Sequence, residues 1–250
     1  MIAVSIIGSG NVAFHLISAL KKLEDIQLVQ ICARNSKNIE KLVDLKQIVC
    51  SPTDLKPVDI CLIAIADDAI ESVSKLIPFE NRIVAHTSGT LPMTALSTKN
   101  RRAVFYPLQT FSLSKPVDFR TIPICLESEF SEDFETIEKL ANTISNVTYS
   151  INSKQRKALH VAAVFVNNFV NQLYQIGYEI CEENNMSFEI LKPLIIETAD
   201  KIKTMNPSAA QTGPAKRNDS KTIAAHIDFL EDKKRQAIYT LMTQTIQSYE

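Results

Sequence analysis

A chain of 250 residues with 45% hydrophobic and 22% charged side chains has the composition of a globular protein with one large or two ordinary domains. The formal net charge of −1 offers no long-range attraction to nucleic acid or to an anionic membrane surface, so neither is an expected partner. The longest uninterrupted apolar run, residues 60–66, is too short to span a bilayer, and no signal peptide is expected because no basic leader opens the chain.

The five cysteines are scattered and form no C-x-x-C pair, and four of them lie in apolar, strand-like runs. Such cysteines are typical of reduced core side chains, so we expect a cytoplasmic protein. No metal site is predicted. Two short basic clusters, residues 154–157 and 233–235, are expected to be solvated faces of helices.

The first half of the chain alternates strand and helix patterns, which predicts a parallel sheet covered by helices on both faces. Strands are predicted at 2–7, 27–32, 47–50, 58–65, 82–87, 102–106, 122–126 and 146–150. Helices are predicted at 11–22, 36–45, 68–77, 91–98 and 131–144. The nearly continuous apolar run at 58–65 is typical of a strand that is buried on both faces.

After Asn152 the pattern becomes wholly helical. Helices are predicted at 153–184, 187–203, 220–230 and 232–248. Pro193 is expected to bend the second of these helices or to split off its start, and Asp219 is the predicted N-cap of the third. The predicted organisation is therefore a doubly wound α/β domain, residues 1–151, followed by an all-helical domain, residues 152–250.

A glycine-rich turn directly follows the first predicted strand. Gly8 permits the tight turn, Gly10 lets the backbone approach a pyrophosphate, and Ala13 lets the next helix pack closely on the strand. The first N–H groups of that helix are free to bind an anion. Because a strand and a helix flank the glycines, the motif predicts a nucleotide site. Its predicted contacts are Gly8, Ser9, Gly10, Asn11 and Val12.

The end of the second predicted strand indicates which dinucleotide is bound. NAD sites usually place a carboxylate there, but this strand continues into Ala33-Arg34-Asn35-Ser36. A guanidinium followed by an amide and a hydroxyl suits a 2′-phosphate, so Arg34, Asn35 and Ser36 are predicted to bind NADP(H). The alternative is that Arg34 is a surface turn residue and that Ser36 caps the following helix.

Two further loops leave the carboxyl ends of strands, where ligands of such sheets bind. In the first, Ala66 and Asp67 are predicted cofactor contacts, although Asp67 could equally serve to cap the next helix. In the second, His86 precedes Thr87-Ser88-Gly89, which combines donors, acceptors and a glycine at a strand end. His86 is therefore also predicted to contact the cofactor.

Five motifs in order resemble those of an uncharacterised bacterial family. They are residues 7–13, 86–89, 106–111, 160–169 and 211–217. Members of that family pair an NADP-oxidoreductase-type Rossmann domain with a helical C-terminal domain of unknown function. More distantly, the chain is similar to pyrroline-5-carboxylate reductases and β-hydroxyacid dehydrogenases. One departure is visible, because the last family motif commonly ends in Arg-Gly-Asp and here reads Arg217-Asn218-Asp219. Asparagine tolerates a left-handed backbone, so the turn can be kept.

The resemblance implies the fold and the cofactor, but not the substrate. It implies a Rossmann domain followed by an all-α domain similar to the C-terminal domain of 6-phosphogluconate dehydrogenase. It also implies NADP(H) as cofactor and a homodimer formed through the helical domain. The apolar helix that contains residues 159–180 fits such an interface, and it could equally be a core within one domain.

The long predicted helix carries a polar stripe of His160, Asn167, Asn168 and Asn171, at spacings close to whole turns. Because the neighbouring residues are apolar, these side chains must find hydrogen-bond partners or face a wet cleft. On the residues alone, a buried packing network is the stronger interpretation. The resemblance favours a site, since related dehydrogenases place a proton donor and an asparagine on this helix. Our hypothesis makes His160 the general acid, Asn168 the residue that orients the substrate, and Ser88 a second donor.

Substrate contacts are predicted at Gln109 and Thr110, just after a strand end, and at Arg217. Arg217 or Lys216 could hold a carboxylate, and a solvated loop between helices is an equal alternative for this segment. The favoured function is hydride transfer between NADPH and a C=O or C=N bond of a small, anionic metabolite. The alternative is an NADP(H)-binding sensor or regulatory protein without turnover. That alternative stays open because the lysine that β-hydroxyacid dehydrogenases use as proton donor is missing, unless Lys157 serves.

Overall fold

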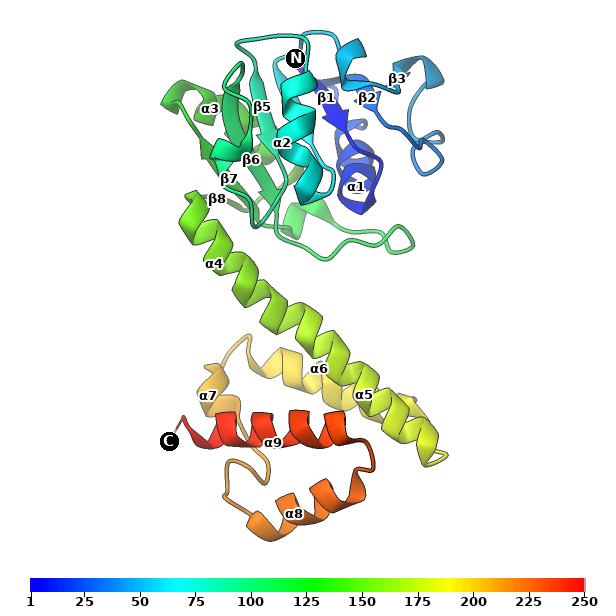
Figure 1. The fold of residues 1–250 in the computed structure, drawn as a ribbon, viewed down its shortest axis with the longest axis vertical. Coiled ribbons are helices and arrows are strands. Elements are labelled where there is room, and N and C mark those ends of the chain that lie inside the picture. The colour runs from blue at the N-terminus through cyan, green and yellow to red at the C-terminus, as the bar shows by residue number, and fades with distance from the viewer. Residues whose placement is uncertain (250) are drawn as a thin grey trace. The chain divides into compact units, whose positions relative to one another are not determined.

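The computed structural model describes residues 1–249, so Glu250, the end of the predicted helical domain, lies outside the described residues. The chain divides after Asn167 into two compact units (Figure 1). The first unit contains the sheet, and the second contains helices. The long helix begins at Ser153, as predicted, and its first turns belong to the first unit. Within residues 1–249 no helix has the length and apolar character needed to cross a membrane.

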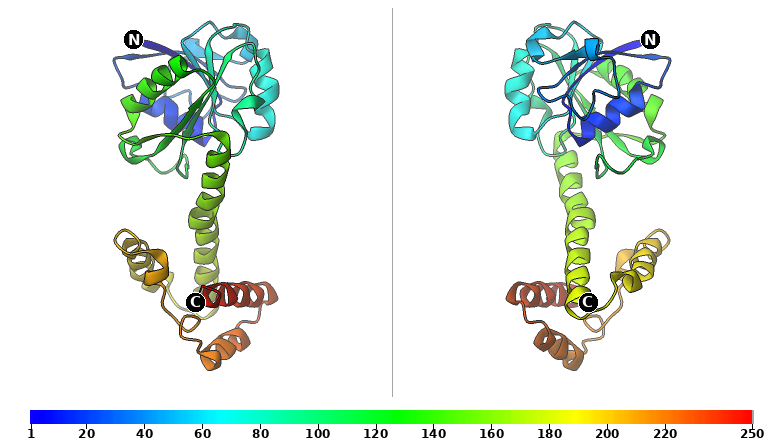
Figure 2. Two further views of the ribbon diagram at one scale, coloured as in Figure 1. Left: turned by 90° about the vertical axis from the view of Figure 1, so that its left-hand side faces the viewer. Right: turned by 90° about the vertical axis from the view of Figure 1, so that its right-hand side faces the viewer.

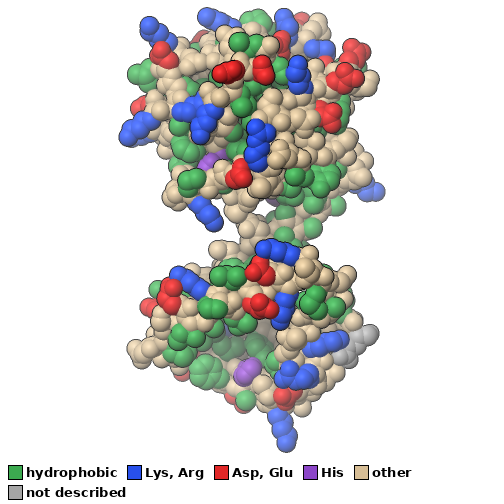
Figure 3. Space-filling view, turned by 180° about the vertical axis from the view of Figure 1, so that it is seen from behind, with side chains coloured by type: hydrophobic (Ala, Val, Ile, Leu, Met, Phe, Trp, Pro, Cys, Tyr) green, Lys and Arg blue, Asp and Glu red, His purple; other side chains and the backbone are tan. Residues whose placement is uncertain are grey.

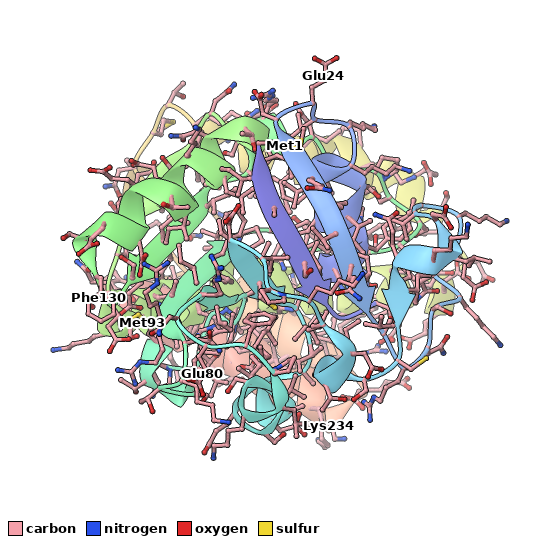
Figure 4. The ribbon with its side chains drawn as sticks, turned by 90° about the horizontal axis from the view of Figure 1, so that it is seen from above. Met1, Glu24, Glu80, Met93, Phe130 and Lys234 are labelled. Atoms are coloured by element: carbon pink, nitrogen blue, oxygen red, sulfur yellow. The ribbon has the colours of Figure 1, made fainter. Side chains whose placement is uncertain are left out.

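The first unit is built on an eight-stranded sheet with the order β3-β2-β1-β4-β5-β6-β7-β8. The strands are β1 (Ile2–Ile7), β2 (Ile26–Cys32), β3 (Ile48–Val49), β4 (Ile60–Ile63), β5 (Ile83–His86), β6 (Arg101–Pro107), β7 (Ile124–Ser128) and β8 (Thr148–Ser150). The first six are mutually parallel, and β7 runs antiparallel to β6. Figure 4 shows β1 and β2 side by side, with Met1 at the start of β1. The order 3-2-1-4-5-6 is that of the predicted doubly wound fold, which is confirmed.

Both faces of the sheet are buried, which explains why β4 is apolar throughout. Its four residues alternate between two cores, with Ile60 and Leu62 in one and Cys61 and Ile63 in the other. The first core includes side chains of α1 (Asn11–Leu20) and α3 (Ser131–Ile144), and the second includes Ile70 of α2 (Asp67–Leu76). Figure 2 shows α1 and α3 on one face of the sheet and α2 on the other. All eight predicted strands and these three predicted helices are therefore confirmed.

Two predicted helices of the first unit, 36–45 and 91–98, are wrong. In the region 36–45, turns lead to Asp44, whose carboxylate accepts the Lys46 amide and caps a short 3₁₀ turn at Leu45–Gln47. In the region 91–98, only Met93–Ala95 forms a 3₁₀ turn. There the Ser97 amide donates to the Ser74 hydroxyl at 3.0 Å, instead of to a carbonyl of its own segment.

The predicted all-helical character of the second half is confirmed. The helices are α4 (Ser153–Ala163), α5 (Val170–Glu183), α6 (Lys192–Lys201), α7 (Pro207–Ala210), α8 (Ser220–Phe229) and α9 (Lys233–Gln247). A π-helical segment, Val164–Phe169, joins α4 to α5. Pro193 lies in the first turn of α6, and Asp219 caps α8 by accepting the Thr222 amide, as predicted. Asn218 has φ 52°, so asparagine does take the left-handed conformation at the altered motif.

Candidate active site

A cavity of about 410 Å³ lies at the carboxyl ends of β1, β2 and β4. The sheet order reverses between β1 and β4, and this is where doubly wound sheets bind their ligands. Most of the residues predicted to contact the cofactor line it: Gly8, Ser9, Gly10, Asn11, Val12, Arg34, Asn35 and Ala66. Ser36, Asp67 and His86 are not among its lining residues.

The two glycines of the turn are needed for different reasons. Gly8 has φ 134°, and a Cβ there would lie 2.1 Å from the Ala64 carbonyl oxygen, so the fold itself requires glycine. Gly10 has φ −76°, and apart from its two chain neighbours no residue comes within 4 Å of the position that its Cβ would take. The fold does not require glycine at this second position. The open space at Gly10 is instead a cradle that fits an approaching ligand.

Side chains on either side hold the glycine-rich turn in place. The side-chain NH₂ of Asn38 donates to the Ser9 carbonyl at 3.3 Å, and the side-chain NH₂ of Asn11 donates to the Phe111 carbonyl at 2.8 Å. Helix α1, which starts at Asn11, has no side-chain cap and no acidic residue in its first turn. Its first N–H groups are therefore available to an anion in the cavity.

The Arg34 side chain is exposed at the edge of the cavity and makes no hydrogen bond or ion pair within the described part of the chain. Its two neighbours are engaged locally. The Asn35 side-chain oxygen accepts the Lys37 amide at 3.2 Å, and the Ser36 hydroxyl donates to Glu40 at 2.6 Å. Arg34 is therefore the charged group of residues 34–36 that is free to pair with an added phosphate, and the Asn35 side-chain NH₂ is also free.

The loop after β5 is held by the Ser88 hydroxyl. This hydroxyl donates to the Asp67 carboxylate at 2.8 Å and accepts the amides of Thr90 and Leu91, each at 3.0 Å. In this structure the Ser88 proton is donated to Asp67, at the start of α2, so the hydroxyl ties the loop to that helix. The His86 side chain is fully buried beneath the loop, where its Nδ1 accepts the Ser88 amide at 3.2 Å.

A second polar pair lies beside this loop, where α4 meets β6. The Tyr106 hydroxyl lies 3.0 Å from Nδ1 of His160, and the two rings meet edge to face. The space for this contact comes from Gly89, because a Cβ there would lie 2.5 Å from the His160 Nδ1. Burial raises the pKa of Tyr106 to about 12, so its hydroxyl keeps its proton at neutral pH.

The expectation that residues 154–157 form a solvated face is wrong at Arg156. Three of the four side chains are exposed, but Arg156 is fully buried and pairs with Glu127 of β7. Arg156 also donates to the Leu91 carbonyl at 2.5 Å and to the Ser153 hydroxyl at 3.2 Å. It therefore ties α4 both to the sheet and to the loop after β5, one helical turn before His160.

The buried His86 makes the stability of the protein sensitive to acid. Burial, aided by the positive charge of Arg156, lowers the pKa of His86 from 6.5 to about 4. Between pH 4 and 6.5, His86 is protonated in the unfolded chain but neutral in the folded protein. The His86 contribution to stability is therefore fully present above about pH 6.5, and about 3 kcal/mol is lost as the pH falls to 4. Urea unfolding at several pH values measures this loss. We expect His86→Asn, which can still accept the Ser88 amide, to weaken the dependence. An equal dependence in both proteins would refute this origin.

The remaining predicted residues are exposed. Gln109 and Thr110 follow β6 in the first unit, and Asn168 and Arg217 belong to the second unit. Asn168 lies in the π-helical segment, a feature often found at functional sites. Within residues 1–249, no group of three or more His, Cys, Asp and Glu side chains could hold a metal ion.

Sequence reasoning missed three residues that shape the site. Tyr106 and Gly89 were visible only as members of motifs, because their contact with His160 joins segments far apart in the chain. Asn38, which holds the Ser9 carbonyl, lies in a segment predicted to be helical. An unusual aromatic-proline pair at 106–107 and a rare glycine at 89 were the available signals.

Comparison with known proteins gives the family. Residues 122–246 match a family model described as a domain of unknown function, DUF2520. A solved structure from Bacteroides fragilis, named as a candidate NADP oxidoreductase, is 33% identical, with 99% of this chain and 98% of that chain covered and a TM-score of 0.90. None of the curated proteins compared with the chain matches it.

Two more distant structures share the fold. A protein from Thermotoga maritima is 21% identical, with coverage of 98% and 97% of the two chains and a TM-score of 0.75. The pyrroline carboxylate reductase of Plasmodium falciparum, solved with NADP bound, is 15% identical, with coverage of 99% and 96% and a TM-score of 0.64.

Proposed function

This chain belongs to the DUF2520 family, and we propose that it is an NADP(H)-dependent oxidoreductase acting on a C=O or C=N bond of a small, anionic metabolite. The observation that carries the proposal is the cavity at the β1–β4 crevice, with an open cradle at Gly10 and an unpaired Arg34 at its edge. The name of the Bacteroides fragilis relative supports the same cofactor.

The residues that line the cavity fit a dinucleotide with a 2′-phosphate. The backbone at Gly8–Gly10 and the first N–H groups of α1 would hold the pyrophosphate. Arg34 would pair with the 2′-phosphate, and the Asn35 amide would add a donor. Ala66 lines the cavity beyond the pyrophosphate region. When bound, NADPH supplies the hydride.

His160 is the proposed proton donor. Its Nδ1 is held by Tyr106, and its Nε2 makes no hydrogen bond to any residue of the described range 1–249. A donor at Nε2 can stabilise negative charge that develops on a substrate oxygen, or protonate a substrate nitrogen. Ser88 and Asp67 support the loop that borders this ring and leave the donation to His160.

Four other residues are proposed to contact the substrate. Asn168 would orient the substrate, Gln109 and Thr110 would add hydrogen bonds, and Arg217 would hold a carboxylate. The five cysteines are free, which fits the proposed cytoplasmic location.

We also propose that the helical unit mediates homodimerisation. Large apolar side chains are exposed on this unit, among them Ile190, Leu194 and Leu241. It also contains an apolar hollow of about 480 Å³, and Figure 3 shows hydrophobic side chains gathered around a histidine on that unit. Large apolar side chains that gather on one exposed surface are a common mark of an interface. Sedimentation equilibrium measures the stoichiometry, and a monomer at micromolar concentration would contradict the proposal.

Arg34→Ala tests the cofactor. Loss of a charge-assisted contact costs about 1.5–3 kcal/mol, so we expect the Kd for NADPH to rise about 10- to 100-fold. The Kd for NADH should change less than about twofold, because NADH has no 2′-phosphate for Arg34 to bind. Isothermal titration calorimetry measures both constants. Lys37→Ala, an exposed cation nearby, is the matched control. An equal loss for both cofactors, or wild-type preference for NADH, would overturn the NADP assignment.

A substrate panel separates the enzyme from the alternative. NADPH oxidation is followed with small keto acids, aldehydes and cyclic imines, each with and without a carboxylate. Turnover that falls at least 100-fold in His160→Ala supports the proposed mechanism, since general acid catalysis contributes about 10²–10⁴-fold. Tight NADPH binding with no turnover across the panel would instead support a sensor.

A further inference from the structure

The pairing of His160 with Tyr106 is built into the fold and is not a chance surface contact. Tyr106 is 8% exposed, lies on β6 and places its hydroxyl 3.0 Å from Nδ1 of His160 on α4. The edge-to-face ring geometry, with an interplanar angle of 67°, fixes the orientation of the imidazole. One of the two ring nitrogens is therefore committed to a protein partner.

Gly89 is the third part of this arrangement. A Cβ at residue 89 would lie 2.5 Å from Nδ1 of His160 and 2.9 Å from Cζ of Tyr106. Real Cβ atoms do not approach other atoms so closely, so any side chain here would drive the two rings apart. Gly89 has no positive φ, so glycine is required by the rings and not by the backbone.

We propose that Tyr106 is a positioning residue that holds His160 with its proton on Nε2, so that an N–H donor is presented to the substrate. The inference deepens the proposed function, because it rests on His160 as the donor. Tyr106 does not touch the substrate in this scheme. It acts by donating its hydroxyl proton to Nδ1, which leaves the proton of the neutral imidazole on the other nitrogen.

Burial keeps Tyr106 protonated and therefore able to donate to Nδ1 of His160. Burial raises the pKa of Tyr106 to about 12, so the hydroxyl retains its proton throughout the physiological range. If His160 gains a second proton, Nδ1–H donates to the hydroxyl oxygen instead, and Nε2–H still points away from the pair. In both charge states the available nitrogen of His160 is a hydrogen-bond donor.

Nuclear magnetic resonance of the full-length protein labelled with 15N-histidine tests the inference without any substrate. At a pH where the ring is neutral, we expect His160 to show a protonated Nε2 and an unprotonated Nδ1. In Tyr106→Phe, the Nδ1 signal should move toward the protonated position as both tautomers become populated. Gly89→Ala should do the same by separating the rings while keeping both groups. His160→Gln assigns the signals.

A second pair in the protein provides the matched control. His226 Nδ1 lies 2.8 Å from the Tyr239 hydroxyl in the helical unit. Tyr239→Phe should therefore alter the His226 signals and leave those of His160 unchanged. A wild-type His160 with its proton on Nδ1, or a tautomer unaffected by both Tyr106→Phe and Gly89→Ala, would overturn the inference. NADPH affinity is measured on the same samples, and its absence in the wild type would refute the proposed function while leaving the tautomer result intact.

Discussion

Replacing Gly8 by alanine is expected to destabilise the protein by about 3–5 kcal/mol, whereas the same change at Gly10 should leave its stability nearly unchanged. At Gly8, two costs combine: an alanine is strained at φ 134°, and its Cβ would lie 2.1 Å from the Ala64 carbonyl oxygen. At Gly10, the backbone suits any residue, and apart from its two chain neighbours the added methyl group meets no residue within 4 Å. Urea unfolding of both variants measures the difference.

Gly10→Ala should instead weaken cofactor binding. If the open space above Gly10 holds a pyrophosphate, a methyl group there raises the Kd for NADPH by about 10-fold or more, which corresponds to at least about 1.4 kcal/mol. Calorimetric titration of NADPH into the folded variant measures this. The two variants thus separate a glycine needed for folding from one needed for binding. Wild-type affinity in Gly10→Ala would remove the pyrophosphate from this position.

The difference between these glycines shows what sequence reasoning could and could not supply. The motif identified the turn, because a strand, two glycines and a helix form a local pattern. Strand β4 was also identified from a local pattern, because its continuous apolar run predicted burial on both faces. The close approach of the Ala64 carbonyl, distant in sequence, which makes glycine necessary at residue 8, is visible only in the fold.

The errors share a physical cause, which is that distant side chains changed the environment of a local pattern. Arg156 belongs to a basic run on a helix, yet Glu127 and the Leu91 carbonyl draw it into the interior. Residues 91–98 have a helical pattern, but the Ser74 hydroxyl takes the Ser97 amide. None of these partners could be chosen from periodicity or spacing.

The buried pair of Arg156 and Glu127 carries the second large prediction. Glu127→Gln is expected to destabilise the protein by about 3–5 kcal/mol, because it leaves the fully buried Arg156 without a compensating charge. The Ser153 hydroxyl, which donates to both Glu127 oxygens at 3.0 and 2.8 Å, loses half of its acceptors as well. Urea unfolding followed by circular dichroism measures the cost.

Glu129→Gln is the matched control, since Glu129 lies two residues away and pairs with Arg102, where the two side chains are 28% and 17% exposed. Water screens that pair, so its loss should cost about 1 kcal/mol or less. The double variant Glu127→Leu with Arg156→Met should recover most of the stability that Glu127→Gln loses, because it leaves no unpaired buried charge. If Glu127→Gln costs no more than Glu129→Gln, Arg156 is not held by Glu127 in solution. Contacts other than the pair of Arg156 and Glu127 would then have to hold α4, and with it His160, against β7.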